Sequence, residues 1–209
     1  MFGRITAAAG LVFLSPVIAM AAIAVLLETG SPILFRQTRI GRKGRPFQLL
    51  KFRSMRSGSG GPQITSSHDR RITRVGTILR RFKVDEVPQL WNVIRGDMNL
   101  VGPRPEVPEY VDLNDAAWQQ VLSIRPGISD LATLVYRDEE KLLSSAVDTE
   151  NFYRNVVLPA KLALSLHYLK KRSVWTDVQL LLLTLRYSFI PYGFDPQSVK
   201  QQFCCEEEL

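Results

Sequence analysis

The chain begins with a long apolar segment that a Ser-Pro pair divides. Positions 5–27 carry no charged residue and are mostly Ala, Val, Leu and Ile. At about 1.5 Å per residue, a helix of this length could span the roughly 30 Å hydrocarbon core of a membrane. Pro16, however, has no N–H to donate to the carbonyl of Val12, and its ring crowds that carbonyl. The pattern therefore predicts a helix that kinks or breaks at Ser15 and Pro16.

This segment could be a hairpin, a single-pass helix or a signal peptide, and the charges that flank it help to distinguish the three. Residues 36–56 are strongly basic, and no acidic residue follows Glu28 until Asp69. The positive-inside rule places such a block in the cytoplasm, and Arg4 prefers the same side. The pattern therefore favours a hairpin that enters and leaves one membrane face. A kinked single-pass helix is one alternative, and a cleaved signal peptide ending near residues 19–21 is another, although the basic block would oppose export.

Hydrophobic periodicity predicts further elements along the chain. Partial alternation over 46–55 suits an extended strand. Apolar residues at helical spacing over 71–82 predict a basic amphipathic helix whose arginines lie largely on its other side. The Gly- and Ser-rich stretch 57–67 is typical of a surface loop. Residues 173–194 contain an apolar run, ended by Pro191, that is too short and interrupted to cross a membrane securely, so a buried or interfacial helix is expected there.

Composition bounds the organisation and the class of partner. The 209 residues are 45% hydrophobic and carry a net charge of +7. We expect two parts, a re-entrant membrane hairpin over 1–30 and one cytosolic, membrane-associated domain over 31–209. The charge favours an anionic partner, which phospholipid headgroups, nucleic acid or phosphorylated small molecules would all provide. The adjacent Cys204 and Cys205 can neither staple the fold nor offer metal-ligand spacing.

The segment 83–105 carries the candidate chemistry. Asp85 and Glu86 stand just ahead of Pro88 and of a short apolar run, which predicts a helix that ends before Gly96. The simplest interpretation is that Asp85 is an N-cap and that Glu86 is a favourable charge at the helix start. The alternative is an anion site, because unpaired amides at a helix start can hold a phosphate.

Basic residues around this segment favour the second interpretation. Arg80 lies shortly before Asp85, and Arg104 stands between two prolines that limit how its guanidinium can be aimed. Arginine binds phosphate in a bidentate manner, so a rigid mount is useful. A carboxylate among cations stays ionised at neutral pH. Asp85 could then attack phosphorus to form an acyl phosphate, or hold Mg²⁺ that bridges substrate phosphates.

Four motifs, in this order, resemble those of one protein family. They are the Ser-Pro pair at 15–16, LLKFRSM at 49–55, VDEVPQLWNVIRGDMNLVGPRPE at 84–106 and IRPGIS at 124–129. Together they resemble the bacterial sugar transferase family, the small monotopic phosphoglycosyl transferases. The likeness covers roughly residues 2–130, and a weaker likeness lies near 166–185.

The resemblance implies a fold, a reaction and a location. The fold would be α/β and mostly helical, with a re-entrant membrane helix broken at Ser15 and Pro16, a compact cytosolic domain and amphipathic interfacial helices. The enzyme would transfer a sugar-1-phosphate from a nucleoside diphosphate sugar, usually a UDP-sugar, to a polyprenyl phosphate such as undecaprenyl phosphate. This step initiates glycoconjugate synthesis, including exopolysaccharide biosynthesis. The protein would lie in the bacterial inner membrane with its catalytic domain on the cytoplasmic face.

The resemblance also implies roles for individual residues. Asp85 would be the nucleophile that forms a covalent phosphosugar intermediate, Glu86 would be its dyad partner, and both would hold Mg²⁺. The residues expected to bind substrate phosphates are basic: Lys51, Arg80, Arg104 and Arg125. Glu86 could accept the proton of the polyprenyl phosphate or bind the metal, and the sequence leaves both roles open. A homodimer is compatible with these expectations.

The chain departs from the family pattern at two places. Phe2-Gly3 stands where a Phe-Asp pair is frequent. After RPGIS the chain reads DLATLVYRDEEKLL at 130–143, where many members continue with Gly-Trp-Ala-Gln-Val-Asn-Gly-Arg. The second departure bears on specificity for the sugar or the nucleotide.

Two functions of other classes are alternatives. A basic nucleic-acid-binding protein would account for the charge, but no such motif occurs and the apolar N-terminus argues against it. We therefore expect no nucleic-acid partner. A membrane-anchored scaffold without catalysis would explain the topology and would tolerate replacement of Asp85.

Overall fold

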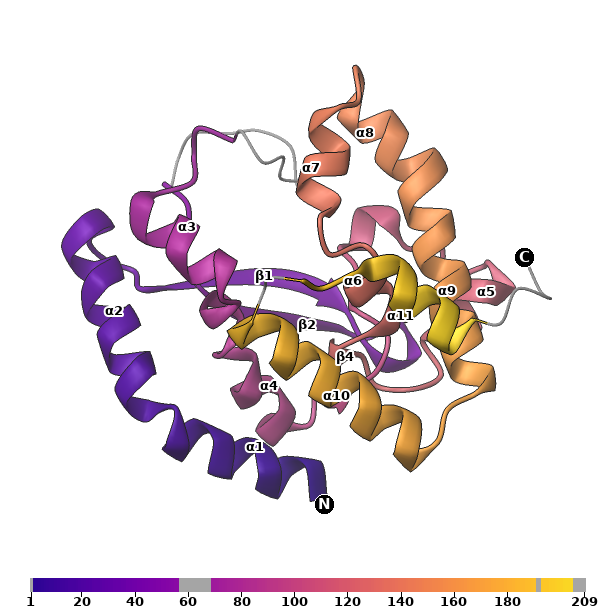
Figure 1. The fold of residues 1–209 in the computed structure, drawn as a ribbon, viewed down its shortest axis with the longest axis horizontal. Helices are drawn as coiled ribbons and strands as arrows, with labels where there is room; N and C mark the ends of the chain where they lie inside the picture. Colours follow the sequence, from indigo (N-terminus) through magenta and orange to yellow (C-terminus); the bar gives the residue numbers. More distant parts are fainter. Residues whose placement is uncertain (1, 57–68, 191–192, 205–209) are drawn as a thin grey trace.

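The N-terminal segment folds as two helices with a sharp bend between them. The computed structural model describes residues 2–56, 69–190 and 193–204. Helix α1 (Phe2–Phe13) and helix α2 (Ser15–Thr29) are bent by 62° at the break between them, and Pro16 lies in the first turn of α2. Figure 1 shows the pair curving along one side of the molecule. The predicted break at Ser15 and Pro16 is thus confirmed, because proline is compatible with a first turn and not with a helix interior.

No single helix in the described ranges is long and apolar enough to span a membrane, and only the bent pair passes that test, as a unit. Both helices pack on the rest of the protein. Ala7 of α1 is fully buried beside Val93 and Met98, and Val25 of α2 is buried beside Phe52. The bent pair is therefore continuous with the hydrophobic core along one of its sides.

The C-terminal end of α2 is fastened to two neighbouring segments. The Glu28 carboxylate accepts hydrogen bonds from the backbone N–H groups of Arg74 (2.8 Å) and Val75 (2.9 Å). The buried Arg53 guanidinium donates to the carbonyl oxygens of Thr29 (2.7 Å) and Ser31 (3.2 Å). These bonds satisfy orphan donors of the next helix and orphan acceptors of α2.

The strands form two small sheets. Strand β1 (Leu34–Ile40) pairs antiparallel with β2 (Pro46–Phe52), in a register that runs from Leu34 opposite Phe52 to Ile40 opposite Pro46. The 3₁₀ turn η1 (Arg42–Gly44) connects them. The strand expected over 46–55 is confirmed as β2. Strand β1 was not predicted, because its arginines hide the alternation in a strand of which only Ile40 is buried.

A parallel pair of short strands lies at the centre of the domain. Strand β3 (Asn99–Val101) pairs with β4 (Gly127–Ser129), with Asn99 opposite Gly127 and Val101 opposite Ser129. Between β2 and β3 lie helix α3 (Arg74–Arg81), the 3₁₀ turn η2 (Val84–Glu86) and helix α4 (Gln89–Arg95). The helix predicted over 71–82 is confirmed as α3, and the helix predicted to end before Gly96 is confirmed as α4.

The remaining elements surround the parallel pair. They are η3 (Pro108–Tyr110), α5 (Ala116–Val121), α6 (Leu131–Val135), α7 (Glu139–Ser144), α8 (Thr149–Phe152), the π-helical segment η4 (Tyr153–Val157), α9 (Leu158–Lys170), α10 (Val174–Phe189) and α11 (Pro196–Phe203). The largest core cluster joins Leu131, Tyr168 and Leu180 from three of these helices. The expected helix within 173–194 is confirmed as α10.

The fold is therefore α/β and mostly helical, as predicted. The division into 1–30 and 31–209 stays a prediction. The loop expected over 57–67 and Pro191 lie outside the described residues. Several apolar side chains remain exposed on α2 and α10, among them Leu27 at 82% and Trp175 at 68%.

We predict that Gly127→Ala destabilises the domain. An added Cβ would lie within 3.0 Å of backbone atoms of Gly102 and Val101, which a paired strand cannot move aside cheaply. The expected loss is about 3 kcal/mol of unfolding free energy, measured by denaturant unfolding of the detergent-held protein. Gly3→Ala is the matched control, because nothing lies within 4 Å of an added Cβ there. Equal stability of the two variants would contradict the prediction.

Candidate active site

The turn η2 presents two adjacent carboxylates in a buried position. Lys83 precedes the turn in the left-handed conformation (φ 56°, ψ 19°), which redirects the chain after α3. The Glu86 N–H then bonds the Lys83 carbonyl at 3.1 Å. Asp85 is 5% exposed and Glu86 9% exposed. Burial of two neighbouring carboxylates is costly unless cations compensate them.

Glu86 is compensated by cations from two other segments. The Arg104 guanidinium donates to both Glu86 oxygens, at 2.6 Å and 3.2 Å, and Lys51 Nζ lies 3.2 Å from Glu86 Oε1. These pairs join β2, η2 and the loop after β3. Burial raises the pKa of Glu86, but Arg104 and Lys51 outweigh it and hold that pKa well below its ordinary value. Glu86 is therefore a permanent anion that organises two of the predicted phosphate ligands.

Asp85 lies in a different environment from its neighbour. Its Oδ1 atom is buried and has no hydrogen-bond partner in the described part of the chain. Burial raises the pKa of Asp85, and the negative charge of Glu86 raises it further, while Lys51 opposes them. The N-cap interpretation of Asp85 is wrong, because α4 begins at Gln89 without a side-chain cap. Asp85 instead offers a buried oxygen to which no described residue donates a hydrogen bond.

Arg80 reaches the site from the last turn of α3. Its Nη2 atom is paired with Glu140 Oε1 at 2.8 Å, and its buried Nη1 atom has no hydrogen-bond partner among the described residues. The charges of Arg80 and Lys83 both lower the pKa of Asp85. Lys83 is one of the basic residues that precede Asp85 in the sequence, together with Arg80 and Arg81.

Arg125 is the one predicted phosphate-binding residue whose side chain pairs with no carboxylate among the described residues. Its side chain is half-buried and forms no ion pair or hydrogen bond within the described residues. Its backbone carbonyl lies beside Gly102, just before the loop that carries Arg104. The phosphate-binding role of Arg125 stays a prediction.

A second buried carboxylate, Glu106, supports the Arg104 loop. Its oxygens contact Arg39 Nη1 at 3.3 Å, the Tyr153 hydroxyl at 2.8 Å and Lys161 Nζ at 3.4 Å. Arg39 also donates to the Pro105 carbonyl at 3.0 Å. The loop is thereby tied to β1, η4 and α9. Sequence reasoning missed this cluster, for which the position of Glu106 next to the Pro-Arg-Pro motif was the available signal.

With this geometry established, the comparison with known proteins decides the family. The sequence profile described as "Bacterial sugar transferase" matches residues 1–190. This chain belongs to the bacterial sugar transferase family. All four motifs and both carboxylates of η2 lie within the matched part.

Several relatives of this sugar transferase have names that state a reaction. The "UDP-glucose:undecaprenyl-phosphate glucose-1-phosphate transferase" of Caulobacter vibrioides is 38% identical over 82% of the chain. The "UDP-N-acetylgalactosamine-undecaprenyl-phosphate N-acetylgalactosaminephosphotransferase" of Aeromonas hydrophila is 35% identical over 86% of the chain. The match spans 62% of the first protein and 40% of the second, less than two thirds of each. The "Uncharacterized sugar transferase EpsL" of Bacillus subtilis is 33% identical, with 90% of this chain and 86% of that protein covered.

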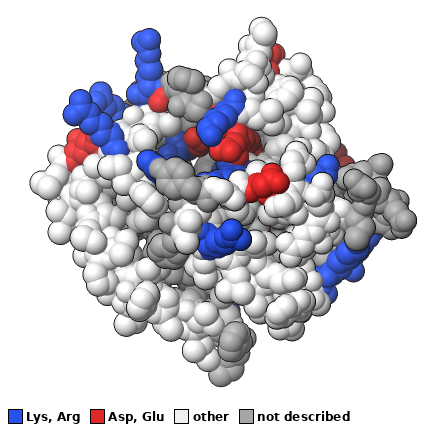
Figure 2. Space-filling view, viewed as in Figure 1, with Lys and Arg blue, Asp and Glu red and all other residues white. Residues whose placement is uncertain are grey.

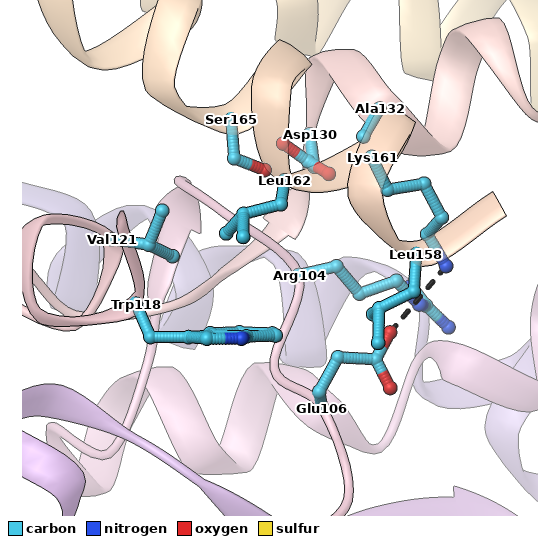
Figure 3. Close-up of a pocket in the computed structure, with 10 residues that line it drawn as sticks. All are labelled: Arg104, Glu106, Trp118, Val121, Asp130, Ala132, Leu158, Lys161, Leu162 and Ser165. Atoms are coloured by element: carbon cyan, nitrogen blue, oxygen red, sulfur yellow. Dashed lines mark hydrogen bonds and ion pairs between the residues drawn. The ribbon is translucent and has the colours of Figure 1, made fainter. Parts of the chain in front are cut away.

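The sugar transferase also contains a small cavity behind Arg104, shown in Figure 3. Its volume is about 20 Å³, enough for one water molecule. Asp130, at the carboxyl end of β4, lines it together with Lys161 and Ser165. Asp130 is 1% exposed, and neither carboxylate oxygen completes a hydrogen bond with the described residues. Burial raises the pKa of Asp130 to about 6, against the opposing charges of Lys161 and Arg104.

The donor set at η2 fits a magnesium ion only in company with a substrate. The described residues contain no group of three or more His, Cys, Asp or Glu side chains at metal-binding separation. Both Glu86 oxygens contact cations, whereas Asp85 Oδ1 is unpartnered. Mg²⁺ is commonly bound by one or two carboxylates together with substrate phosphates and water, so this donor set is compatible with it.

We predict that Asp130→Asn stabilises the folded protein in a pH-dependent manner. A folded-state pKa raised from 3.8 to about 6 means that stability is greatest when Asp130 is protonated and falls as the pH rises between these values. The raised pKa corresponds to about 3 kcal/mol. Denaturant unfolding at pH 7.5 should show the variant more stable by up to about that amount, with the difference shrinking toward pH 4. The exposed substitution Asp112→Asn is the control, and a pH-independent difference for Asp130→Asn would contradict the prediction.

Proposed function

We propose that this protein transfers a sugar-1-phosphate from a nucleoside diphosphate sugar, most simply a UDP-sugar, to polyprenyl phosphate. The observation that carries the proposal is the division of the dyad, in which Glu86 is held by two cations and Asp85 keeps an unpartnered, buried oxygen. The names of the relatives support the general reaction. The product would be the first lipid-linked intermediate of a glycoconjugate such as an exopolysaccharide.

The reaction proceeds through a covalent intermediate. An Asp85 carboxylate oxygen attacks the phosphorus that bears the sugar, an O–P bond forms, and the P–O bond to the nucleotide breaks. The nucleoside monophosphate leaves with the bridging oxygen. A phosphate oxygen of the polyprenyl phosphate then attacks the same phosphorus, and the bond to Asp85 breaks, which restores the carboxylate. Two anionic substrates thereby use one basic site in turn.

The cations around the dyad bind and orient the phosphates. Arg104 and Lys51 are held in place by Glu86, and Arg80 comes from α3 on the side of Asp85. The low pKa of Glu86 makes it a poor base in this arrangement, so we assign it the role of positioning the cations. Asp85 would hold Mg²⁺ through its available oxygen together with the donor diphosphate, with Glu86 as the adjacent second carboxylate, and the ion would supply positive charge near the transferred phosphate.

The bent helix pair supports attachment to one face of the bacterial inner membrane. Both of its arms pack on the same domain, and Arg4 near the start of α1 lies against Gly96. The bend itself projects Val12 (76% exposed) and Phe13 (83% exposed). Side chains this apolar are suited to a lipid environment. We infer a re-entrant hairpin, with the catalytic domain on the cytoplasmic face at the level of the polyprenyl phosphate headgroup.

The two alternative functions are weaker. A scaffold gives no reason for a buried, unpartnered carboxylate beside a cation-held one. A nucleic-acid-binding protein gives no reason for the bent apolar pair or for the family to which the chain belongs.

We predict that Asp85→Asn lowers turnover by at least about a thousandfold while the protein stays folded, because the amide is not a nucleophile. The measurement is release of UMP from a panel of UDP-sugars by nanodisc-held protein with undecaprenyl phosphate and Mg²⁺. Asp115→Asn is the matched control, since Asp115 is an exposed N-cap of α5 and asparagine caps equally well. Full turnover by Asp85→Asn would remove the nucleophile assignment. Failure of every donor with folded, inserted wild type would contradict the reaction.

We also predict that both ends of the bent pair are accessible from the cytoplasmic face alone. Gly3→Cys and Ser31→Cys, each in a chain with Cys204 and Cys205 replaced by serine, would be labelled by a membrane-impermeant maleimide. A hairpin gives labelling of both sites in inverted vesicles and of neither in right-side-out vesicles. A single-pass helix would instead give labelling of the two sites from opposite faces.

A further inference from the structure

One contact at the proposed site comes from outside the dyad. Glu140, in the first turn of α7, pairs with Arg80 at 2.8 Å, and its side chain is 43% exposed. Figure 2 shows Asp and Glu side chains gathered beside Lys and Arg side chains next to a hollow between α3 and α7. The Glu140 carboxylate, from a separate helix, is therefore paired with Arg80, the residue to which we assign binding of a substrate phosphate.

Helix α7 bridges the two sides of the site. The neighbouring Glu139 pairs with Lys161 of α9 at 3.0 Å, while Leu143 is buried at 1% exposure and anchors the helix in the core. Both glutamates belong to the stretch 130–143, in which the chain departs from the pattern of its family. The Arg80 contact is thus supplied by a segment that lies outside the four motifs.

The ion pair with Glu140 engages only one terminal nitrogen of the Arg80 guanidinium. Its Nη2 atom contacts Glu140, and its buried Nη1 atom has no hydrogen-bond partner in the part of the chain described. Exposed ion pairs contribute little to stability, because water screens them and both side chains lose freedom. A phosphate carries more charge than a carboxylate and accepts two parallel hydrogen bonds from arginine. A diphosphate can therefore replace Glu140 on Arg80.

We propose that Glu140 is a displaceable competitor of the nucleotide phosphates for Arg80 and weakens the hold of the site on UDP and UMP. The proposal rests on the phosphate-binding role of Arg80 given above. When the donor binds, Glu140 leaves Arg80. After the phosphosugar is transferred to Asp85, Glu140 pairs with Arg80 again. This favours departure of the nucleoside monophosphate, which has one phosphate fewer with which to compete for Arg80.

The test compares the binding of UDP and UMP to nanodisc-held wild type, Glu140→Gln and Glu109→Gln by calorimetry. Glu109→Gln is the matched control, because Glu109 also pairs with an arginine, Arg154, at 2.6 Å, and its side chain is 51% exposed, close to the 43% of Glu140. We expect Glu140→Gln to lower the Kd of both nucleotides about two- to fivefold, an effect that shrinks at high salt. Inhibition of turnover by added UMP should strengthen by the same factor, whereas a merely structural loss would weaken it.

A second comparison isolates Arg80 as the residue through which Glu140 acts. In an Arg80→Met background, Glu140→Gln should leave the Kd of UDP unchanged. Tightening that persists without Arg80, or a Kd for Glu140→Gln equal to that of wild type, would overturn the proposal. Absence of UDP binding by folded wild type and by Glu140→Gln would overturn it as well. Wild type that binds UDP but releases no UMP from any donor contradicts the transferase reaction instead, and the competition at Arg80 is then still decided by the binding data.

Discussion

The buried contact of Glu86 with Arg104 and Lys51 is the constraint on which the site depends. These three residues come from η2, the loop after β3 and strand β2, so one carboxylate fixes three segments at a single point. Removing one partner of a buried ion pair leaves an uncompensated charge, which typically costs about 3–5 kcal/mol. The same interaction gives Asp85 and Glu86 different environments. Because Glu86 takes both cations, Asp85 is left with an oxygen that has no hydrogen-bond partner among the described residues, as the proposed nucleophile requires.

A second layer of charges keeps Arg104 in place from behind. Glu106 ties its loop to Arg39 of β1 and to Lys161 of α9. The π-helical segment η4 supplies Tyr153, whose hydroxyl donates to Glu106, and such a segment often marks a functional region. Within the described ranges neither Asp130 oxygen completes a side-chain hydrogen bond beside this layer, and a buried carboxylate of this kind is typical of functional sites. The wall of the small cavity is therefore held by ion pairs around Arg104, whereas at Asp130 it contains a buried carboxylate whose charged form is costly.

Local patterns in the sequence were enough to predict the elements that depend on local chemistry. Pro16 predicted the helix break and Gly96 the end of α4, and the motif around Asp85 predicted a candidate site at which the structure brings Lys51 and Arg104 to Glu86. The paired register of β3 and β4 could not be predicted, because three-residue strands have no periodicity of their own. The contacts of Glu140 with Arg80 and of Glu106 with Lys161 join residues far apart in the chain, so only the tertiary fold shows them.

The proposed membrane hairpin and the cations proposed to bind phosphate are supported by the same contacts. Glu28 at the end of α2 caps the start of α3, and the last turn of α3 carries Arg80. Arg53 holds the final carbonyls of α2 and lies two residues beyond Lys51, which contacts Glu86. A displacement of the hairpin would therefore act on Arg80 through one connection and on Lys51 through the other. This coupling sets the position of Lys51 and Arg80 relative to the bent pair, as the proposed transfer to a polyprenyl phosphate held at a fixed depth by lipid would require.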